Sequence, residues 1–265
     1  MQNRHRMTKI RKILGVSFSI GTASDLVRLS LRGGLVVVPS APVLVDARKS
    51  STLRQALEHA DLAVPDSGLM ILLWRLLSSE RLERVSGLEY LKTLLALPEL
   101  KGSEEVLWVM PSSESLSRNL AWLAANGFPS DQEQCYIAPH YGIGELYDES
   151  LLIKIKKRRP RHVIIALGGG VQERLGWFLR KELGSVNPPY QPGIHCIGAA
   201  IGFLTGDQVR IPVWADYLYL GWLVRCISSP RRFVPRYWRA LRLIPLMLRY
   251  REASLPNPES TRGEP

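Results

Sequence analysis

A chain of 265 residues, 46% of them hydrophobic, can bury a substantial core, which excludes a disordered, collagenous or disulfide-stapled protein. Its three cysteines, Cys135, Cys196 and Cys226, are odd in number and far apart. They favour reduced core thiols and a reducing compartment over disulfide bridges or metal ligands. The net charge of +11 indicates an anionic partner, which is nucleic acid, phospholipid headgroups or a phosphorylated substrate.

Neither an exported protein nor a bilayer-spanning protein is predicted. Residues 1–12 form a basic N-terminal arm, and the brief apolar stretch after it lacks the small-residue cleavage site of a signal peptide. Arginines interrupt even the most hydrophobic stretch near the C-terminus, so no window reaches the roughly 18 uncharged apolar residues of a spanning helix. A cytoplasmic location is therefore expected.

Short apolar runs alternate with longer amphipathic segments from Leu35 to about Gly206, which is typical of strand–loop–helix units around a mostly parallel α/β sheet. Ser51 is expected to cap one of the helices between the strands, and Ser112 or Ser113 to begin another. The expected strands are Leu35–Val38, Leu62–Val64, Val106–Met110, Cys135–Ala138, His162–Leu167 and Ile194–Gly198.

A candidate site is expected beyond the carboxyl ends of the strands, where open α/β sheets bind ligands. Asp66 directly follows the strand Leu62–Val64 and precedes an apolar helix that begins near Leu69. A carboxylate at this point can act as a general base or orient a hydroxyl. On local grounds alone, an aspartate that only caps the helix is the simpler interpretation. The candidate loops begin at Pro39, Pro65, Pro139 and Gly168.

A glycine-rich turn follows the expected strand His162–Leu167. It contains Gly168–Gly170, after which Gln172 and Glu173 begin a helix. Exposed backbone amides in such a turn can bind a diphosphate. The turn lacks the spacing of a dinucleotide fingerprint and the lysine of a Walker loop, so a strand-to-helix turn without a ligand stays an alternative. An NAD-dependent oxidoreductase is a third and weaker hypothesis.

The histidines predict no metal site. None of the five pairs with another at metal-ligand spacing, and the sequence has no Cys/His cluster or paired-carboxylate motif. His140 and Tyr141 lie in a candidate ligand loop after an expected strand. A lone loop histidine is usually solvated, whereas a tyrosine can stack on a nucleotide base, so Tyr141 is the better candidate.

Residues 210–251 carry much of the positive charge. They contain nine arginines against one acid, Asp216, and they are rich in tryptophan, tyrosine and leucine. Two or three helices are expected, broken near Pro230 and Pro235. The composition fits an element in a membrane interface, where aromatic rings lie at headgroup depth and arginines attract anionic lipid. A basic helical pair packed on the domain is the alternative.

Nucleic acid is not expected as the partner of this basic segment, because no zinc finger, RNA-recognition or helix-turn-helix signature is present. The final stretch, residues 252–265, is polar and contains prolines, and it is expected to be disordered.

Taken together, these segments resemble the WecG/TagA/CpsF glycosyltransferases from about Ile13 to about Leu248, with the motifs in the family's order. The family's Thr-Pro-Asn loop resembles Val38-Pro39-Ser40, its Asp-Gly turn resembles Asp66-Ser67, and its Gly-x-Pro-x-Gln-Glu loop resembles Gly168–Glu173. The family's C-terminal motifs resemble Arg210–Trp214, Trp222, Arg225, Pro230, Arg232, Arg236 and Tyr237.

The resemblance implies a Rossmann-like domain over residues 13–209, with helices on both faces of its sheet. It implies that residues 210–251 form a helical appendage that closes over the site and docks on the inner face of the cytoplasmic membrane. It also implies inverting transfer of an N-acetylmannosamine-like sugar from a UDP carrier to a polyprenyl-diphosphate-linked sugar, without a cofactor. Such a reaction belongs to cell-surface or exopolysaccharide biosynthesis.

The resemblance also assigns roles to residues. Asp66 would be the general base that deprotonates the acceptor hydroxyl, and arginines would hold diphosphate charge, for which their planar fork is suited. The implied nucleotide-sugar-binding residues are Val38, Ser40, Tyr141, Gly168, Gly170, Gln172 and Glu173. The implied lipid-diphosphate-binding residues are Arg225, Arg232 and Arg236.

Several positions depart from the family pattern. Val38 and Ser40 replace threonine and asparagine, and Gly170 replaces proline. Gly221 replaces an acid, and Gly202 replaces the aspartate expected at the uracil edge. A site that hydrogen-bonds a base discriminates less when the partner group is absent. The alternative function is therefore a catalytically degenerate family member that acts as a membrane-bound assembly partner, and a homo-oligomer is left open.

Overall fold

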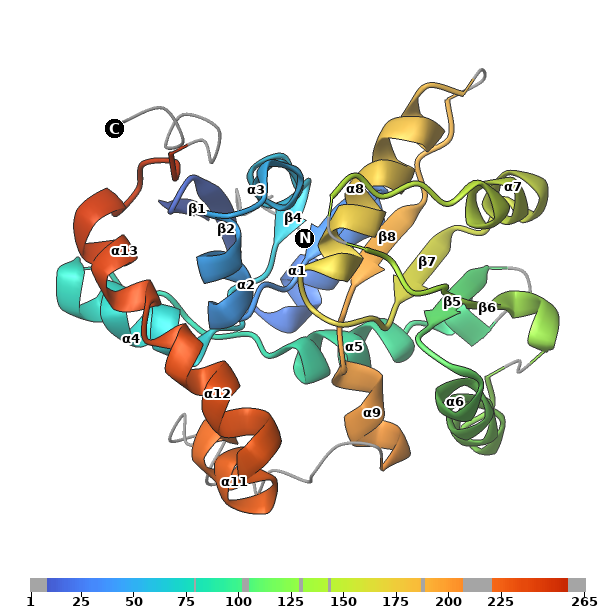
Figure 1. Cartoon of the computed structure of the whole chain (residues 1–265). Coiled ribbons are helices and arrows are strands. Elements are labelled where there is room, and N and C mark those ends of the chain that lie inside the picture. Colours follow the sequence, from blue (N-terminus) through green and yellow to red (C-terminus); the bar gives the residue numbers. More distant parts are fainter. Residues whose placement is uncertain are drawn as a thin grey trace, which may run out of the picture.

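The computed structural model describes residues 9–78, 80–101, 105–128, 131–142, 144–186, 189–206 and 221–256. Within these residues, an eight-stranded sheet forms the centre of the molecule and helices cover both of its faces (Figure 1). The strands are β1 Lys9–Ile13, β2 Val16–Ile20, β3 Gly34–Val37, β4 Leu62–Ala63, β5 Val106–Met110, β6 Cys135–Ile137, β7 His162–Ile165 and β8 Gly193–Cys196. The predicted α/β architecture is confirmed.

The strands lie in the order β1-β2-β4-β3-β8-β7-β5-β6. Only the β1–β2 pair is antiparallel among the described strand pairs, and the other pairs are parallel. Of the six predicted strands, all but β5 end earlier than the sequence predicted, so that Val38, Leu167 and Gly198, for example, lie in loops. Because parallel strands share one carboxyl edge, the loops after β3, β4, β5, β7 and β8 meet there.

The hairpin of β1 and β2 was not predicted. Leu14 and Gly15 form its two-residue turn, and both have positive φ angles, 51° and 82°. Such a turn usually carries Asn-Gly or Asp-Gly, because these residues tolerate the left-handed conformation. The Leu-Gly turn lacks that signal. The hairpin also places residues 9–12, which were predicted as part of a basic arm, in the sheet.

Two hydrophobic cores lie on opposite faces of the sheet, because side chains of a strand alternate between its faces. Leu35 and Val37 belong to one core and Val36 to the other. The first core packs against α2 Ala41–Asp46, α3 Ser51–Glu58, α4 Gly68–Leu77, α7 Glu149–Arg158, α8 Val171–Gly184 and α13 Leu243–Tyr250. The second packs against α1 Ala23–Ser30, α5 Gly87–Leu95, α6 Ser113–Ala125 and α9 Ala200–Thr205.

The C-terminal helices confirm part of the prediction. α11, Gly221–Ser228, ends just before α12, Pro230–Ala240, which begins with a proline. Proline suits this position because the first N–H of a helix has no intrahelical partner. Pro235 lies inside α12 and does not break it. Helix α12 packs on α2, and α13 packs on α2 and α4, so these helices adjoin the sheet domain.

The chain end beyond α13 is packed as far as residue 256. Leu255 is buried, and the Arg54 guanidinium donates to the carbonyls of Leu255 and Pro256 at 3.1 and 2.6 Å. Residues 252–256, which belong to the stretch expected to be disordered, thus find partners in the hairpin and in α3 that local composition does not show. Among the described residues, no helix combines the length and the apolar character that crossing a membrane requires.

Candidate functional site

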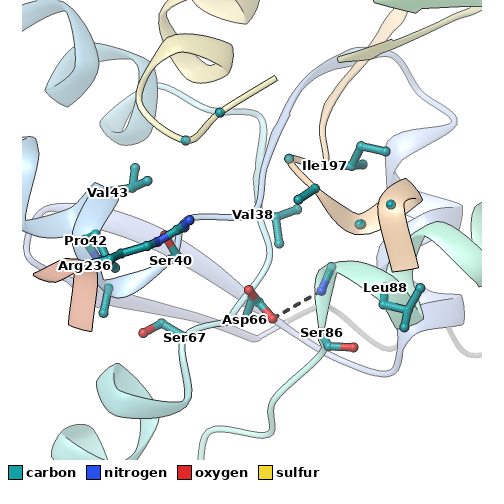
Figure 2. A pocket seen from close by; sticks show the side chains of 18 of the residues that line it. Val38, Ser40, Pro42, Val43, Asp66, Ser67, Ser86, Leu88, Ile197 and Arg236 are labelled. Carbon is teal, nitrogen blue, oxygen red and sulfur yellow. Dashed lines mark hydrogen bonds between the residues drawn. The ribbon is translucent and has the colours of Figure 1, made fainter. Parts of the chain in front are cut away.

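A cavity of about 1560 Å³ lies at the carboxyl edge of the sheet. Residues after β3, β4, β5, β7 and β8 line it, together with the starts of several helices and one side of α12 (Figure 2). The loops at Pro39, Pro65 and Gly168 contribute to its lining, whereas none of the described residues of the loop at Pro139 does. Of the residues singled out from the sequence, the cavity brings together Val38, Ser40, Asp66, Gly168, Gln172, Glu173 and Arg236.

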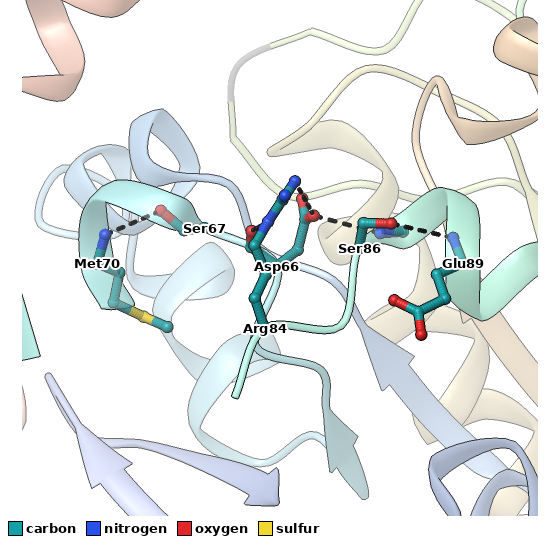
Figure 3. Close-up of polar contacts among 7 residues, drawn as sticks. Asp66, Ser67, Met70, Arg84, Ser86 and Glu89 are labelled. Atoms are coloured by element: carbon teal, nitrogen blue, oxygen red, sulfur yellow. Dashed lines mark hydrogen bonds and ion pairs between the residues drawn. The ribbon is translucent and has the colours of Figure 1, made fainter. Parts of the chain in front are cut away.

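Asp66 lies on the wall of this cavity directly after β4. Its Oδ1 accepts a hydrogen bond from the Gly87 N–H at 3.2 Å, and Arg84 Nη2 lies 3.5 Å from the same oxygen. Arg84 Nε also donates to the Asp66 carbonyl at 2.8 Å (Figure 3). Gly87 is the first residue of α5, so both the helix N-terminus and the guanidinium stabilise negative charge on the carboxylate.

Ser67 is the N-cap of α4, and its hydroxyl accepts a hydrogen bond from the Met70 N–H at 3.3 Å (Figure 3). The alternative in which Asp66 only caps this helix is therefore wrong. The Asp66 carboxylate instead points into the cavity, between the starts of α4 and α5 (Figure 2). It remains open to a ligand on that side, because its side chain is 26% exposed.

The loop after β3 forms another wall. Val38 presents an aliphatic side chain to the cavity near Asp66 and Ile197 (Figure 2). Ser40 occupies the N-cap position of α2, but its side chain makes no capping hydrogen bond. Its hydroxyl is therefore placed at the cavity without being engaged by the helix that it precedes.

The glycine turn is held together by its own side chains. Gly170 has a φ of 90°, and its N–H donates to Glu173 Oε2 at 2.6 Å. Gln172 is only 2% exposed, and its Oε1 accepts from the Gly198 N–H at 2.6 Å. Gln172 Nε2 donates to Glu173 Oε1 and to the Cys196 carbonyl at 3.0 and 3.3 Å. Gln172 thus joins the loops after β7 and β8, and the Gly170 amide is already occupied.

Glu173 and Arg174 stabilise the glycine turn through hydrogen bonds to the backbone of Gly170. Burial raises the pKa of Glu173, although hydrogen bonds from Gln172 and Gly170 and the charge of Arg174 oppose the shift. The Arg174 guanidinium donates to three backbone carbonyls, those of Gly142, Gly144 and Gly170, at 3.1, 2.7 and 3.2 Å. Arg174 therefore fixes the loop around Gly142 relative to the glycine turn. The Gly168 and Gly169 backbones remain on the cavity lining.

Tyr141 is not brought to the cavity. Its hydroxyl donates to Asp148 Oδ2 at 2.5 Å, and Tyr136 donates to the same carboxylate. Burial and the neighbouring Asp148 charge raise the pKa of both tyrosines. Asp148 is the N-cap of α7, so this cluster fixes the start of that helix.

The C-terminal arginines are only partly described. Arg236 points from α12 into the cavity, beside Ser40 and Pro42 (Figure 2). The side chains of Arg225 and Arg232 lie outside the described residues, as does the segment Arg210–Trp214.

Sequence reasoning missed several polar residues of the cavity. Arg84 lies in an irregular segment between α4 and α5, where neither periodicity nor a motif marks it. A second group comes from α5 and from the start of α6, and no local signal marked its members as lining the same cavity as Asp66. This group contains Lys92, Ser112, Ser115 and Arg118.

Two of the histidines form a buried pair away from the cavity. His162 Nδ1 lies 3.1 Å from His195 Nε2, and His195 Nδ1 lies 2.9 Å from the Tyr90 hydroxyl. Burial, followed by the neighbouring Arg161 charge, lowers the pKa of His162 to about 4. Within the part of the chain that the structure describes, no group of three or more His, Cys, Asp or Glu residues could hold a metal ion.

The fold and the cavity define an α/β protein with a candidate ligand site at the carboxyl edge of a mostly parallel sheet, beside an aspartate and several cations. The family model of the WecG/TagA/CpsF glycosyl transferases matches residues 11–256. The chain therefore belongs to this family and is a glycosyltransferase, as its motifs predicted. No curated protein sequence matches it.

Proposed function

We propose that this glycosyltransferase moves an N-acetylmannosamine-like sugar from a UDP-type nucleotide sugar onto a polyprenyl-diphosphate-linked sugar, with inversion at the anomeric carbon. The product would serve cell-surface or exopolysaccharide biosynthesis. The observation that carries the proposal is the position of Asp66, whose carboxylate lies in the cavity at the carboxyl edge of the sheet, with Arg84 beside it. The family supplies the reaction type, and this carboxylate supplies a base for it.

In the proposed reaction, Asp66 accepts the proton of the acceptor hydroxyl while that oxygen attacks the anomeric carbon of the donor. The bond from this carbon to the diphosphate oxygen breaks, and the nucleoside diphosphate leaves from the opposite face with the electron pair. One displacement therefore inverts the configuration. Backbone groups of Gly168 and Gly169, which line the cavity, support the donor side.

The acceptor diphosphate is assigned to Arg225, Arg232 and Arg236, which belong to the proposed appendage of residues 210–251. Arg236 supports this assignment because it points from α12 into the cavity that contains Asp66. A guanidinium can donate two parallel hydrogen bonds to phosphate oxygens.

The appendage is also proposed to dock on the cytoplasmic face of the membrane. Trp238 is 72% exposed on α12, and Val234 of α12, Leu241 after α12 and Leu248 of α13 are also exposed. Arg239 and Arg242 are exposed beside them. Aromatic and aliphatic groups next to arginines fit the headgroup region of an anionic bilayer.

The reaction is tested by incubating the protein with UDP-N-acetylmannosamine or other nucleotide sugars and a sugar linked to a lipid diphosphate. Nuclear magnetic resonance of the product then gives its anomeric configuration. The proposal predicts transfer with inversion. Product with retained configuration would contradict the single displacement, and hydrolysis without transfer would contradict the acceptor class.

Membrane docking is tested by flotation with anionic and with neutral liposomes. We expect binding to anionic liposomes that weakens with salt and is reduced in Trp238→Ser. Tyr147→Ser is the matched control, since Tyr147 is an exposed aromatic residue near α7. Equal loss in the two variants would contradict a role for α12.

The alternative function, a degenerate family member that acts as an assembly partner, draws on one observation. Val38 places an aliphatic wall near Asp66 where the family motif has a hydroxyl. Saturable binding and turnover of any nucleotide sugar would exclude this alternative.

A further inference from the structure

The cavity that contains Asp66 is also lined by apolar residues of α4 and of the α12 region, and we call the part of the cavity that they line the groove. These residues are Leu69 and Leu72 of α4, Phe233 and Trp238 of α12, and Leu241, the C-cap of α12. Phe233 is buried, whereas Leu72 and Leu241 are 43% and 46% exposed. The groove therefore combines apolar side chains that are buried with others that reach the molecular surface.

The same cavity contains a cation, Arg236. Arg236 belongs to the same helix as Trp238, and its guanidinium reaches the loop after β3, beside Ser40 (Figure 2). The acidic side chains of the described lining are Asp66 and Glu173, and Glu173 is fully buried against the Gly170 amide. An anionic group in this part of the cavity would therefore have the Arg236 guanidinium and the Ser40 hydroxyl as neighbours.

A ligand that contacts the groove, Arg236 and Asp66 together has three chemically different parts. An apolar chain suits the leucines and Trp238, an anion suits Arg236, and a hydroxyl suits Asp66. A free sugar or nucleotide would leave the apolar walls in contact with polar groups, which is unfavourable. A chain joined through a diphosphate to a sugar matches all three parts.

We propose that the groove between α4 and α12 binds the first isoprenoid units of the acceptor lipid, while the diphosphate lies at Arg236 and the terminal sugar lies at Asp66. This inference rests on the proposed lipid-linked acceptor. It adds a chain-binding subsite to that acceptor, so the protein recognises the lipid itself as well as the membrane surface.

The test measures binding of diphosphates in buffer without vesicles, so that membrane docking makes no contribution. Isothermal titration compares methyl, dimethylallyl and geranyl diphosphate with the full chain. Each isoprenoid unit that enters the groove is expected to lower Kd by roughly tenfold or more, because burial of its methylene and methyl groups is favourable. Leu72→Ser is expected to remove most of this gain and to leave methyl diphosphate binding unchanged.

Leu76→Ser is the matched control. Leu76 lies on the same helix, is 83% exposed and does not belong to the cavity lining. This variant is expected to keep the full dependence on chain length. A Kd that does not depend on chain length would overturn the proposal, as would an equal effect of the two substitutions.

Transfer to a methyl-diphosphate-linked sugar separates this inference from the proposed function. Turnover of that acceptor, combined with Kd values independent of chain length, would refute the groove and leave the transferase in place. Graded binding of prenyl diphosphates without transfer to any acceptor would support the groove and refute the reaction.

Discussion

Arg84 holds Asp66 at two points. Its Nε donates to the Asp66 carbonyl at 2.8 Å, and its Nη2 lies 3.5 Å from Oδ1. Because the Gly87 N–H donates to the same oxygen, the direction of the carboxylate is fixed by groups that lie well beyond it in the sequence. A base that must meet a substrate hydroxyl depends on such positioning.

Arg84→Gln is expected to lower kcat roughly tenfold to a hundredfold, because the carboxylate loses one of the groups that orient it. The KM of the nucleotide sugar should change little. Steady-state kinetics check this, with Arg81→Gln, an exposed arginine of the same segment, as the control. Unchanged kcat in Arg84→Gln would contradict the positioning role.

Gln172→Met is expected to reduce the free energy of unfolding by about 1–3 kcal/mol, because the buried Gly198 amide loses its hydrogen-bond acceptor. The KM of the donor should also rise, since the loops after β7 and β8 are no longer joined. Urea unfolding and kinetics measure the two effects. Gln134→Met is the control, because Gln134 is buried but its Oε1 has no hydrogen-bond partner. Equal destabilisation of both variants would contradict the bridging role.

The His162–His195 pair predicts a loss of stability in acid. Burial lowers the pKa of both side chains, that of His162 to about 4, so the folded protein keeps them neutral while the unfolded chain binds protons near pH 6.5. Stability is therefore fully present above about pH 6.5 and falls as the pH drops towards 4, by at most about 1.4 kcal/mol per pH unit for each histidine. Unfolding of His162→Gln between pH 7 and 5 should show a shallower slope than the wild type. Identical slopes would refute this account.

Arg236→Gln is expected to raise the KM of the diphosphate acceptor roughly tenfold, because a charge-assisted contact to phosphate is lost. Arg239→Gln serves as the control, since Arg239 lies on the same helix and pairs with Asp46 at 3.2 Å. The KM of the nucleotide sugar should stay constant in both variants. An equal rise in acceptor KM for the two would show that only the net charge of α12 matters.

The alternation of apolar and amphipathic segments was enough to predict six strands of the sheet, because buried parallel strands are short, continuous apolar runs. The β1–β2 hairpin was missed because Leu14 and Gly15 adopt positive φ angles without the usual asparagine or aspartate. The packing of Leu255 was missed because Arg54, which holds it, lies about two hundred residues away in sequence.

The candidate site was predicted where a residue follows a strand directly, as Asp66 does. Residues that reach the cavity from elsewhere, such as Arg84, could not be found, because their contacts depend on tertiary packing. A position shortly after a strand is also not sufficient to place a residue in the cavity, as Tyr141 shows. It lies in the loop after β6, but its hydroxyl donates to Asp148 and Tyr141 does not line the cavity.

The most direct test of the account is the rate of sugar transfer by Asp66→Asn. Asparagine keeps the shape and an oxygen for the Gly87 N–H, but it cannot take up a proton from the acceptor. The kcat of Asp66→Asn should fall by roughly a hundredfold to ten-thousandfold, while its donor binding and thermal unfolding stay unchanged. The control is Asp131→Asn, at an N-cap position that does not line the cavity, and it should transfer sugar at the wild-type rate. Transfer by Asp66→Asn at the wild-type rate would contradict the assignment of Asp66 as the general base.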